Sequence, residues 1–93
     1  MQFEWDKEKA ESNFKKHGVS FEEAETVFED SLAKIFDDEE HSFDERLIGI
    51  VGHSSKKRLL VVAFTETESD IIRIISAREV TSKERREYEN ANG

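Results

Sequence analysis

Cysteine and proline are both absent from this 93-residue chain, and glycine occurs only four times. The absence of cysteine excludes disulfides, thiolate catalysis and zinc sites built on sulfur, and it fits a reducing compartment. The longest apolar stretch, Leu59 to Phe64, is far shorter than the about 20 residues that cross a bilayer. Because no cluster of glycines forms a linker, we expect one domain over residues 1–93, in the cytoplasm and without membrane contact.

Basic side chains are outnumbered in this sequence. Lys and Arg total 14, Asp and Glu total 22, and the formal net charge is −8. This sign opposes long-range attraction of a polyanion such as RNA. The excess lies in the first half, because residues 1–52 carry 6 basic and 15 acidic side chains, whereas residues 53–93 carry 8 and 7. The acidic half suits a basic partner, and a nucleic-acid site is expected nearer the end of the chain.

Two short helices are predicted near the start of the chain. Asp6 can cap a first helix that runs to about His17, and Gly18 is placed to end it. Ser20 and Glu23 form a capping box for a second helix that ends near residue 30. Apolar spacing gives each helix an inner face, made of Ala10 and Phe14 in the first and of Phe21, Ala24, Val27 and Phe28 in the second.

Beyond residue 31 the apolar spacing changes from a helical period to a period of two. It predicts strands over residues 32–36, 46–52, 58–65 and 71–78, with an acidic loop at 37–44. A capping box of Thr81 and Glu84 then starts a polar terminal helix. The expected fold is α+β, an antiparallel sheet with two N-terminal helices packed on one face and a C-terminal helix. Six aromatic residues are expected in the core: Phe3, Trp5, Phe14, Phe21, Phe28 and Phe64.

The last predicted strand carries two arginines, Arg73 and Arg78, among isoleucines. A guanidinium in that setting either completes an ion pair, for which Glu4, Glu45 and Glu84 are candidates, or faces an anionic ligand such as phosphate. Strand alternation puts the two side chains on opposite faces unless a bulge intervenes. We expect Arg78, at the strand end, to be the phosphate contact, with Arg73 as the second candidate.

Four segments occur in this order: Phe3-Glu4-Trp5-Asp6, Lys16-His17-Gly18-Val19-Ser20-Phe21, Glu45-Arg46, and Arg73 to Arg78. Over about residues 2–89 the chain resembles the BrnT family. The resemblance implies a small RelE-like fold and an endoribonuclease toxin of a bacterial type II toxin–antitoxin pair. It also implies a BrnA-type antitoxin that carries a DNA-binding domain, so that DNA is contacted only through the antitoxin. The assembly can be a homodimer or a heterotetramer with the antitoxin, and the sequence does not decide between them.

Metal-independent RNA cleavage by such a toxin needs a base, an acid and cations around the phosphate. Arg78 and Arg73 suit the cationic role. From the pair Glu45-Arg46 we expect Arg46 to face the site, with a cross-strand ion pair as the alternative. No metal or other cofactor is expected.

A basic cluster, Lys15-Lys16-His17, lies at the end of the first predicted helix. His17 is the candidate proton donor or acceptor, and Lys16 and Lys15 are candidate RNA contacts. The alternative for all three is a structural role, because cations at a helix C-terminus are favoured by the macrodipole. The resemblance favours the functional interpretation.

The predicted terminal helix offers Arg85 for phosphate and Tyr88 for proton donation or base stacking. Pairing of Arg85 with Glu89 on a solvated surface, and packing of the Tyr88 ring on the sheet, are the alternatives. The acidic run at residues 37–41 has the oxygen ligands that hard cations bind, but a charge run in a loop is usually solvated.

The chain departs from its relatives at one position near the last hairpin. Many relatives have an arginine where this chain has Thr67, in Thr65-Glu66-Thr67. An endoribonuclease toxin is the first hypothesis. The second is an antitoxin-binding module with weak or no cleavage that acts in autoregulation of its operon, which Thr67 and the net charge of −8 favour. The third is a metal-dependent hydrolase that uses the acidic loop.

Overall fold

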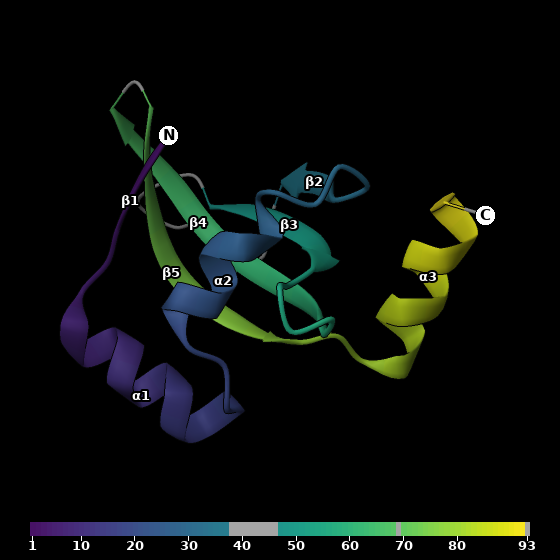
Figure 1. Ribbon diagram of the computed structural model, residues 1–93, viewed down its shortest axis with the longest axis horizontal. Coiled ribbons are helices and arrows are strands. Elements are labelled where there is room, and N and C mark those ends of the chain that lie inside the picture. The colour runs from purple at the N-terminus through teal and green to yellow at the C-terminus, as the bar shows by residue number, and fades with distance from the viewer. Residues whose placement is uncertain (38–46, 69, 93) are drawn as a thin grey trace.

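The computed structural model describes residues 1–37, 47–68 and 70–92. Within them, three helices and five strands follow one another (Figure 1). The elements are β1 (Gln2–Glu4), α1 (Lys7–His17), α2 (Phe21–Val27), β2 (Lys34–Asp37), β3 (Ile48–His53), β4 (Leu59–Glu68), β5 (Ile71–Glu79) and α3 (Ser82–Asn92). The four strands predicted from the period of two are all present, and their ends lie within three residues of the prediction. None of the described helices is long and apolar enough to cross a membrane.

The strands form one mixed sheet in the order β1-β5-β4-β3-β2. The four strands from β2 to β5 pair antiparallel with one another in sequence order, as expected from their short connections. Strand β1 was not predicted, and it adds to β5 in parallel, with Phe3 opposite Ile72. Its polar–apolar–polar pattern covers only Gln2 to Glu4, which is too short for alternation to be recognised in a sequence.

Helix α1 begins and ends as the sequence predicts. The Asp6 carboxylate accepts hydrogen bonds from the backbone N–H groups of Glu8 and Lys9, at 2.8 and 3.2 Å. Gly18 takes the left-handed conformation, with φ of 69°, and its N–H donates to the Phe14 carbonyl at 2.8 Å. The inner face differs from the prediction, because Phe14 is 55% exposed whereas Asn13 is buried. Phe14 is therefore not a core residue.

Helix α2 lies across one face of the sheet, and α1 packs against β5 (Figure 1). Ser20 caps α2 by accepting a hydrogen bond from the Glu23 N–H at 3.0 Å. The predicted core aromatics other than Phe14 are buried or packed against the core. Their rings meet edge to face, with centroid distances of 5.1 Å for Phe3–Phe28, 5.0 Å for Phe28–Phe64 and 5.9 Å for Trp5–Phe21.

Helix α3 stands apart from α1 and α2, beyond the C-terminal end of β5 (Figure 1). Its first turn contains a reciprocal capping box: the Thr81 N–H donates to the Glu84 carboxylate at 2.8 Å, and the Glu84 N–H donates to the Thr81 hydroxyl oxygen at 3.1 Å. Tyr88 is its buried aromatic residue, and the rest of its described surface is mostly polar and exposed. The helix is thus attached to the sheet through few side chains.

Candidate functional site

A bulge in β5 places Arg73 and Arg78 on the same face of the sheet. The pairing with β4 shifts by one residue at Ile75, so that Arg73 and Arg78 lie opposite Thr65 and Val61. Those two partners are four residues apart on β4 and therefore share a face. The bulge interrupts the strict alternation that would have separated the two guanidinium groups. Both project away from the face that α2 covers.

Both arginines are ion-paired in this structure. Arg73 donates to the Glu4 carboxylate at 2.9 Å. Arg78 binds Glu84 with both terminal nitrogens, at 2.8 and 2.9 Å, and also donates to the Glu79 carbonyl at 3.2 Å. The Arg78 guanidinium is the main cause that lowers the pKa of Glu84 to about 2. The ion-pair alternative is thus realised for both residues, and a phosphate at either would compete with a carboxylate.

A second group of cations gathers where α1 ends beside the β5 bulge. A pocket of about 230 Å³ there is lined by Lys9, Ser12, Asn13, Lys16, His17, Ile75 and Ser76. The described lining contains two lysines, a histidine and two hydroxyl groups, and no carboxylate. Lys16 and His17 are the predicted members of this group, and the pocket joins them to the strand that carries the arginines. Lys9, Ser12 and Ser76 were not predicted.

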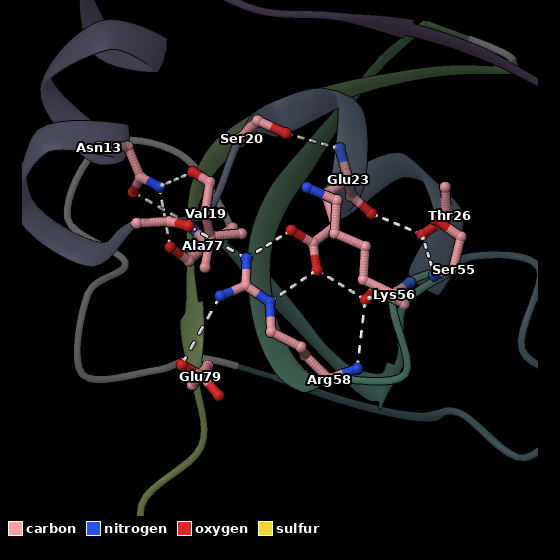
Figure 2. A network of polar contacts seen from close by, with 12 residues as sticks. Asn13, Val19, Ser20, Glu23, Thr26, Ser55, Lys56, Arg58, Ala77 and Glu79 are labelled. Atoms are coloured by element: carbon pink, nitrogen blue, oxygen red, sulfur yellow. Dashed lines mark hydrogen bonds and ion pairs between the residues drawn. The ribbon is translucent and has the colours of Figure 1, made fainter.

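Asn13 fixes the wall of this pocket, and sequence reasoning did not identify it. Its amide nitrogen donates to the Val19 and Ala77 carbonyls at 3.0 and 2.8 Å, and its amide oxygen accepts from the Ala77 N–H at 3.1 Å (Figure 2). Strand β1 ends opposite Arg73, so this side chain pairs with β5 where the neighbouring strand has stopped. The signal in the sequence that could have identified Asn13 is a polar residue on the helix face that points toward the sheet.

A buried carboxylate, Glu23, forms the centre of a second network beside Asn13 (Figure 2). Its carboxylate accepts from the Ser54 hydroxyl at 2.6 Å and from the Arg58 Nε at 3.0 Å, and it also pairs with the Arg58 terminal nitrogen. Arg58 in turn donates to the Gly18 carbonyl at 3.0 Å. The Arg58 guanidinium lowers the pKa of Glu23, against the opposing effect of burial. Glu23 was predicted only as the second half of a capping box, and its side chain is used elsewhere.

The two networks hold the corner between α1 and α2. Asn13 binds the Val19 carbonyl and Arg58 binds the neighbouring Gly18 carbonyl. The corner is thereby tied to β5 and to the residue directly before β4, and these contacts hold the last residues of α1 in place. Lys16 and His17 are positioned beside the β5 bulge by these contacts.

The structure separates three other predicted residues from this pocket. Lys15 lines the groove between α1 and α2, together with Phe14. Arg85 is exposed on α3. Tyr88 is buried, where its hydroxyl donates to the Leu32 carbonyl at 3.3 Å and its ring packs edge to face against His53, with centroids 5.8 Å apart. The alternative of a packed tyrosine ring is therefore realised.

Two predictions fall on residues that the structure does not describe. Arg46, the expected site residue of Glu45-Arg46, lies outside the described ranges, as does most of the acidic run. Among the described residues, no group of three or more His, Cys, Asp or Glu side chains is arranged to hold a metal ion.

The family of the chain follows from comparison with known proteins. Residues 5–84 match the family model described as the ribonuclease toxin, BrnT, of type II toxin–antitoxin systems. The chain belongs to the BrnT family. Among solved structures, it is similar to the ribonuclease toxin BrnT of Brucella abortus, with a TM-score of 0.68 and 24% identity over 88% of this chain and 99% of that one. A search of curated proteins gives no match.

The BrnT match includes the pocket between α1 and β5, but not Glu4, the partner of Arg73. It begins at Trp5 and ends at Glu84, so it spans both sides of the pocket and the Arg78–Glu84 pair, but only the first turn of α3. The likeness to the Brucella toxin is one of fold. Thr67 is exposed in the irregular stretch between Glu66 and Glu68 near the end of β4.

Proposed function

We propose that this protein is an endoribonuclease toxin that cleaves RNA in the cytoplasm without a metal ion, and that a BrnA-type antitoxin with a DNA-binding domain neutralises it. Membership of the BrnT family supports a ribonuclease toxin with an antitoxin partner. The observation that carries the placement of the active site is the pocket between α1 and β5. In a chain with a net charge of −8, it brings Lys9, Lys16 and His17 together without a carboxylate in its described lining.

The side chains of this pocket suit cleavage by the ribose 2′-hydroxyl. The 2′-oxygen forms a bond to the adjacent phosphorus while the bond from phosphorus to the 5′-oxygen breaks, which leaves a cyclic 2′,3′-phosphate and a 5′-hydroxyl. His17 is the group that exchanges protons with these oxygens. Lys16 and Lys9 compensate the charge that develops on the phosphate, and Ser76 can donate a hydrogen bond to it. All atoms that the reaction needs come from the RNA and from these side chains.

Arg78 has a second role in this proposal. It follows Ser76 on the same face of β5, so a strand of RNA that passes from the pocket along this face meets its guanidinium. Because Glu84 already binds both terminal nitrogens, a phosphate must replace this carboxylate or share the guanidinium with it. Arg73 is bound by Glu4 through one terminal nitrogen, and Arg46, which precedes β3 in the sequence, stays a proposed contributor.

A second candidate function is an antitoxin-binding module with weak or no cleavage, which takes part in autoregulation. Two observations favour it. Both strand arginines have carboxylate partners at 2.8 to 2.9 Å, and Thr67 stands where many relatives have a further arginine. Each reduces the number of cations that can meet a phosphate.

Cleavage of end-labelled RNA by the purified protein at low salt, with and without EDTA, separates the two candidates. We expect cleavage that EDTA does not affect, and products that end in a cyclic phosphate. Lys16→Ala and His17→Ala should each reduce the rate by about a hundredfold, the scale of losing one proton-transfer or charge-stabilising group. Lys7→Ala is the matched control, because Lys7 is on the same helix but lines the other groove.

Circular dichroism confirms that each variant is folded. Intact RNA from a folded parent protein would favour the binding module. Loss of activity in EDTA would refute the metal-independent mechanism. If Lys16→Ala and His17→Ala both cleave RNA as fast as the parent protein, the active site lies elsewhere in the molecule.

A further inference from the structure

The two edges of the sheet differ in how they are protected. Strand β1, at one edge, covers only three residues with polar ends, and Asn13 of α1 binds the β5 backbone beyond it. Strand β2, at the other edge, is exposed at all four positions from Lys34 to Asp37. Its pairing with β3 has no register shift, and the sequence has no proline. Among the described residues, β2 has no proline and no bulge, and its charged side chains, Lys34 and Asp37, lie at its two ends and leave Ile35 and Phe36 between them.

Strand β2 also carries apolar side chains on both faces. Ile35 lies opposite Ile50 on the face that holds the core, yet it is 67% exposed, because α2 does not extend over this edge. Phe36 points to the opposite face, where its ring occupies the space that a Cβ of Gly49 would need. Phe36 is still 42% exposed. Apolar residues on both faces are typical of a strand inside a sheet and not of an edge.

A groove continues this surface between β2 and α3. It has a volume of about 340 Å³ and an apolar lining from Phe36, Val51, Tyr88 and Ala91, with Lys34, Glu84 and Glu87 as its charged residues. The groove lies beside β2, so an added strand could place alternate side chains into it. Glu87 is at its rim on α3, where a cation of a bound chain would be favoured.

We propose that β2 and this groove bind an extended segment of the antitoxin, which joins the sheet as a sixth strand beside β2. The segment has apolar side chains toward Ile35 on one face and into the groove on the other, with a lysine or arginine near Glu87. Such strand addition combines main-chain hydrogen bonds with pockets for alternate side chains. This inference rests on the antitoxin partner of the proposed function.

Charge and area favour the antitoxin over a second copy of this chain. The chain carries a net charge of −8, with 15 acidic against 6 basic residues in the half that contains β2, so two copies repel whereas a basic segment is attracted. A four-residue strand also offers much less than the about 800 Å² per partner that a stable interface buries. An antitoxin segment can continue from β2 into the groove and gain the missing area.

Binding of the cognate antitoxin to the full-length toxin and its variants tests this surface. Ile35→Lys should weaken the affinity by about thirtyfold, which corresponds to loss of one interface anchor. Glu87→Lys should also weaken the affinity, and this effect should be larger at low salt. Phe14→Lys is the matched control, because Phe14 is a similarly exposed apolar residue on α1. The affinity of this variant for the antitoxin should equal that of the parent. Hydrogen exchange of the toxin should show new protection of the β2 amides in the complex.

Unchanged affinity of the folded Ile35→Lys protein would overturn the proposal, as would strong loss in Phe14→Lys alone. A free toxin that is dimeric, with its β2 amides already protected, would assign the edge to a second copy and refute the antitoxin as its occupant. RNA cleavage by each variant is measured separately in the absence of antitoxin. Failure of the parent to cleave RNA would refute the ribonuclease proposal while the binding result at β2 is still decisive.

Discussion

The carboxylate of Glu84 binds the guanidinium of Arg78 and the backbone N–H of Thr81 at the same time, with distances of 2.8 to 2.9 Å. One side chain therefore connects the end of β5 to the first turn of α3. Because α3 is otherwise polar, this connection and the buried Tyr88 are the contacts that hold the helix against the sheet. The connection through Glu84 also determines whether Arg78 is available to an anion.

The Glu84 connection predicts a change at low pH. Its pKa is lowered from 4.5 to about 2, so its contribution to stability is complete above the unfolded value and is lost as the pH falls through about 2. We expect the α3 contacts to persist at pH 4 and to be lost near pH 2, as followed by the carboxyl resonance of Glu84 in NMR. A titration of Glu84 near its ordinary value would contradict the ion pair. Glu84→Gln should remove the transition.

Glu23 is predicted to contribute strongly to stability. Glu23→Gln removes the charge that Arg58 faces and weakens the hydrogen bond from Ser54. Because Arg58 is 29% exposed and can be partly hydrated, we expect a loss of about 2 kcal/mol in the free energy of unfolding, below the range for a fully buried pair. Urea denaturation measures it. Glu22→Gln, at the neighbouring exposed position, is the control. If both variants lower the free energy of unfolding by the same small amount, the network does not contribute to stability as proposed.

Asn13→Ala should loosen β5 at one defined point. The variant loses the hydrogen bonds to the Val19 carbonyl and to both backbone groups of Ala77, which costs about 3 kcal/mol at roughly 1 kcal/mol for each bond. Exchange of the Ala77 amide hydrogen with solvent should accelerate more than that of other β5 amides. Glu11→Ala, on the exposed face of the same helix, should leave the exchange unchanged. Uniform acceleration along β5 would indicate global destabilisation and not a local clamp.

Gly18 is predicted to be required for its backbone conformation and not for space. Its φ is 69°, and a Cβ there would meet nothing within 4 Å. Gly18→Ala should therefore cost about 1 kcal/mol from the left-handed conformation alone. Gly18→Asn should cost less, because asparagine adopts this conformation more readily than alanine does. Thermal unfolding of both variants checks the order, and equal losses would point to a steric cause.

Local signals in the sequence predicted the local structure well. The caps at Asp6, Ser20, Gly18 and the Thr81–Glu84 box are each formed by neighbouring residues, so the pattern of types along the chain is sufficient to find them. The four antiparallel strands follow from the period of two. Strand β1 was missed because it is short and pairs with a segment about 70 residues away, and no local pattern reports such a partner.

The arrangement of the candidate site depended on two features that alternation cannot supply. The bulge at Ile75 determines which face Arg78 takes. The partners of the arginines could be named as candidates, but geometry selected Glu4 for Arg73 and Glu84 for Arg78. His17 and Lys16 were predicted from the basic helix end, whereas Lys9, Ser12 and Ser76 join them only through the packing of α1 on β5.

The two walls of the pocket between α1 and β5 are made at different times during synthesis of the chain. One wall comes from residues 7–17 and the other from residues 71–79, so the two walls are translated near opposite ends of the chain. A ribosome that is still making the protein exposes the lysines and the histidine long before the strand that positions them. Fragments from translation that stops before Ile71 therefore carry the cations but not the pocket, and the complete arrangement forms only when synthesis is nearly finished.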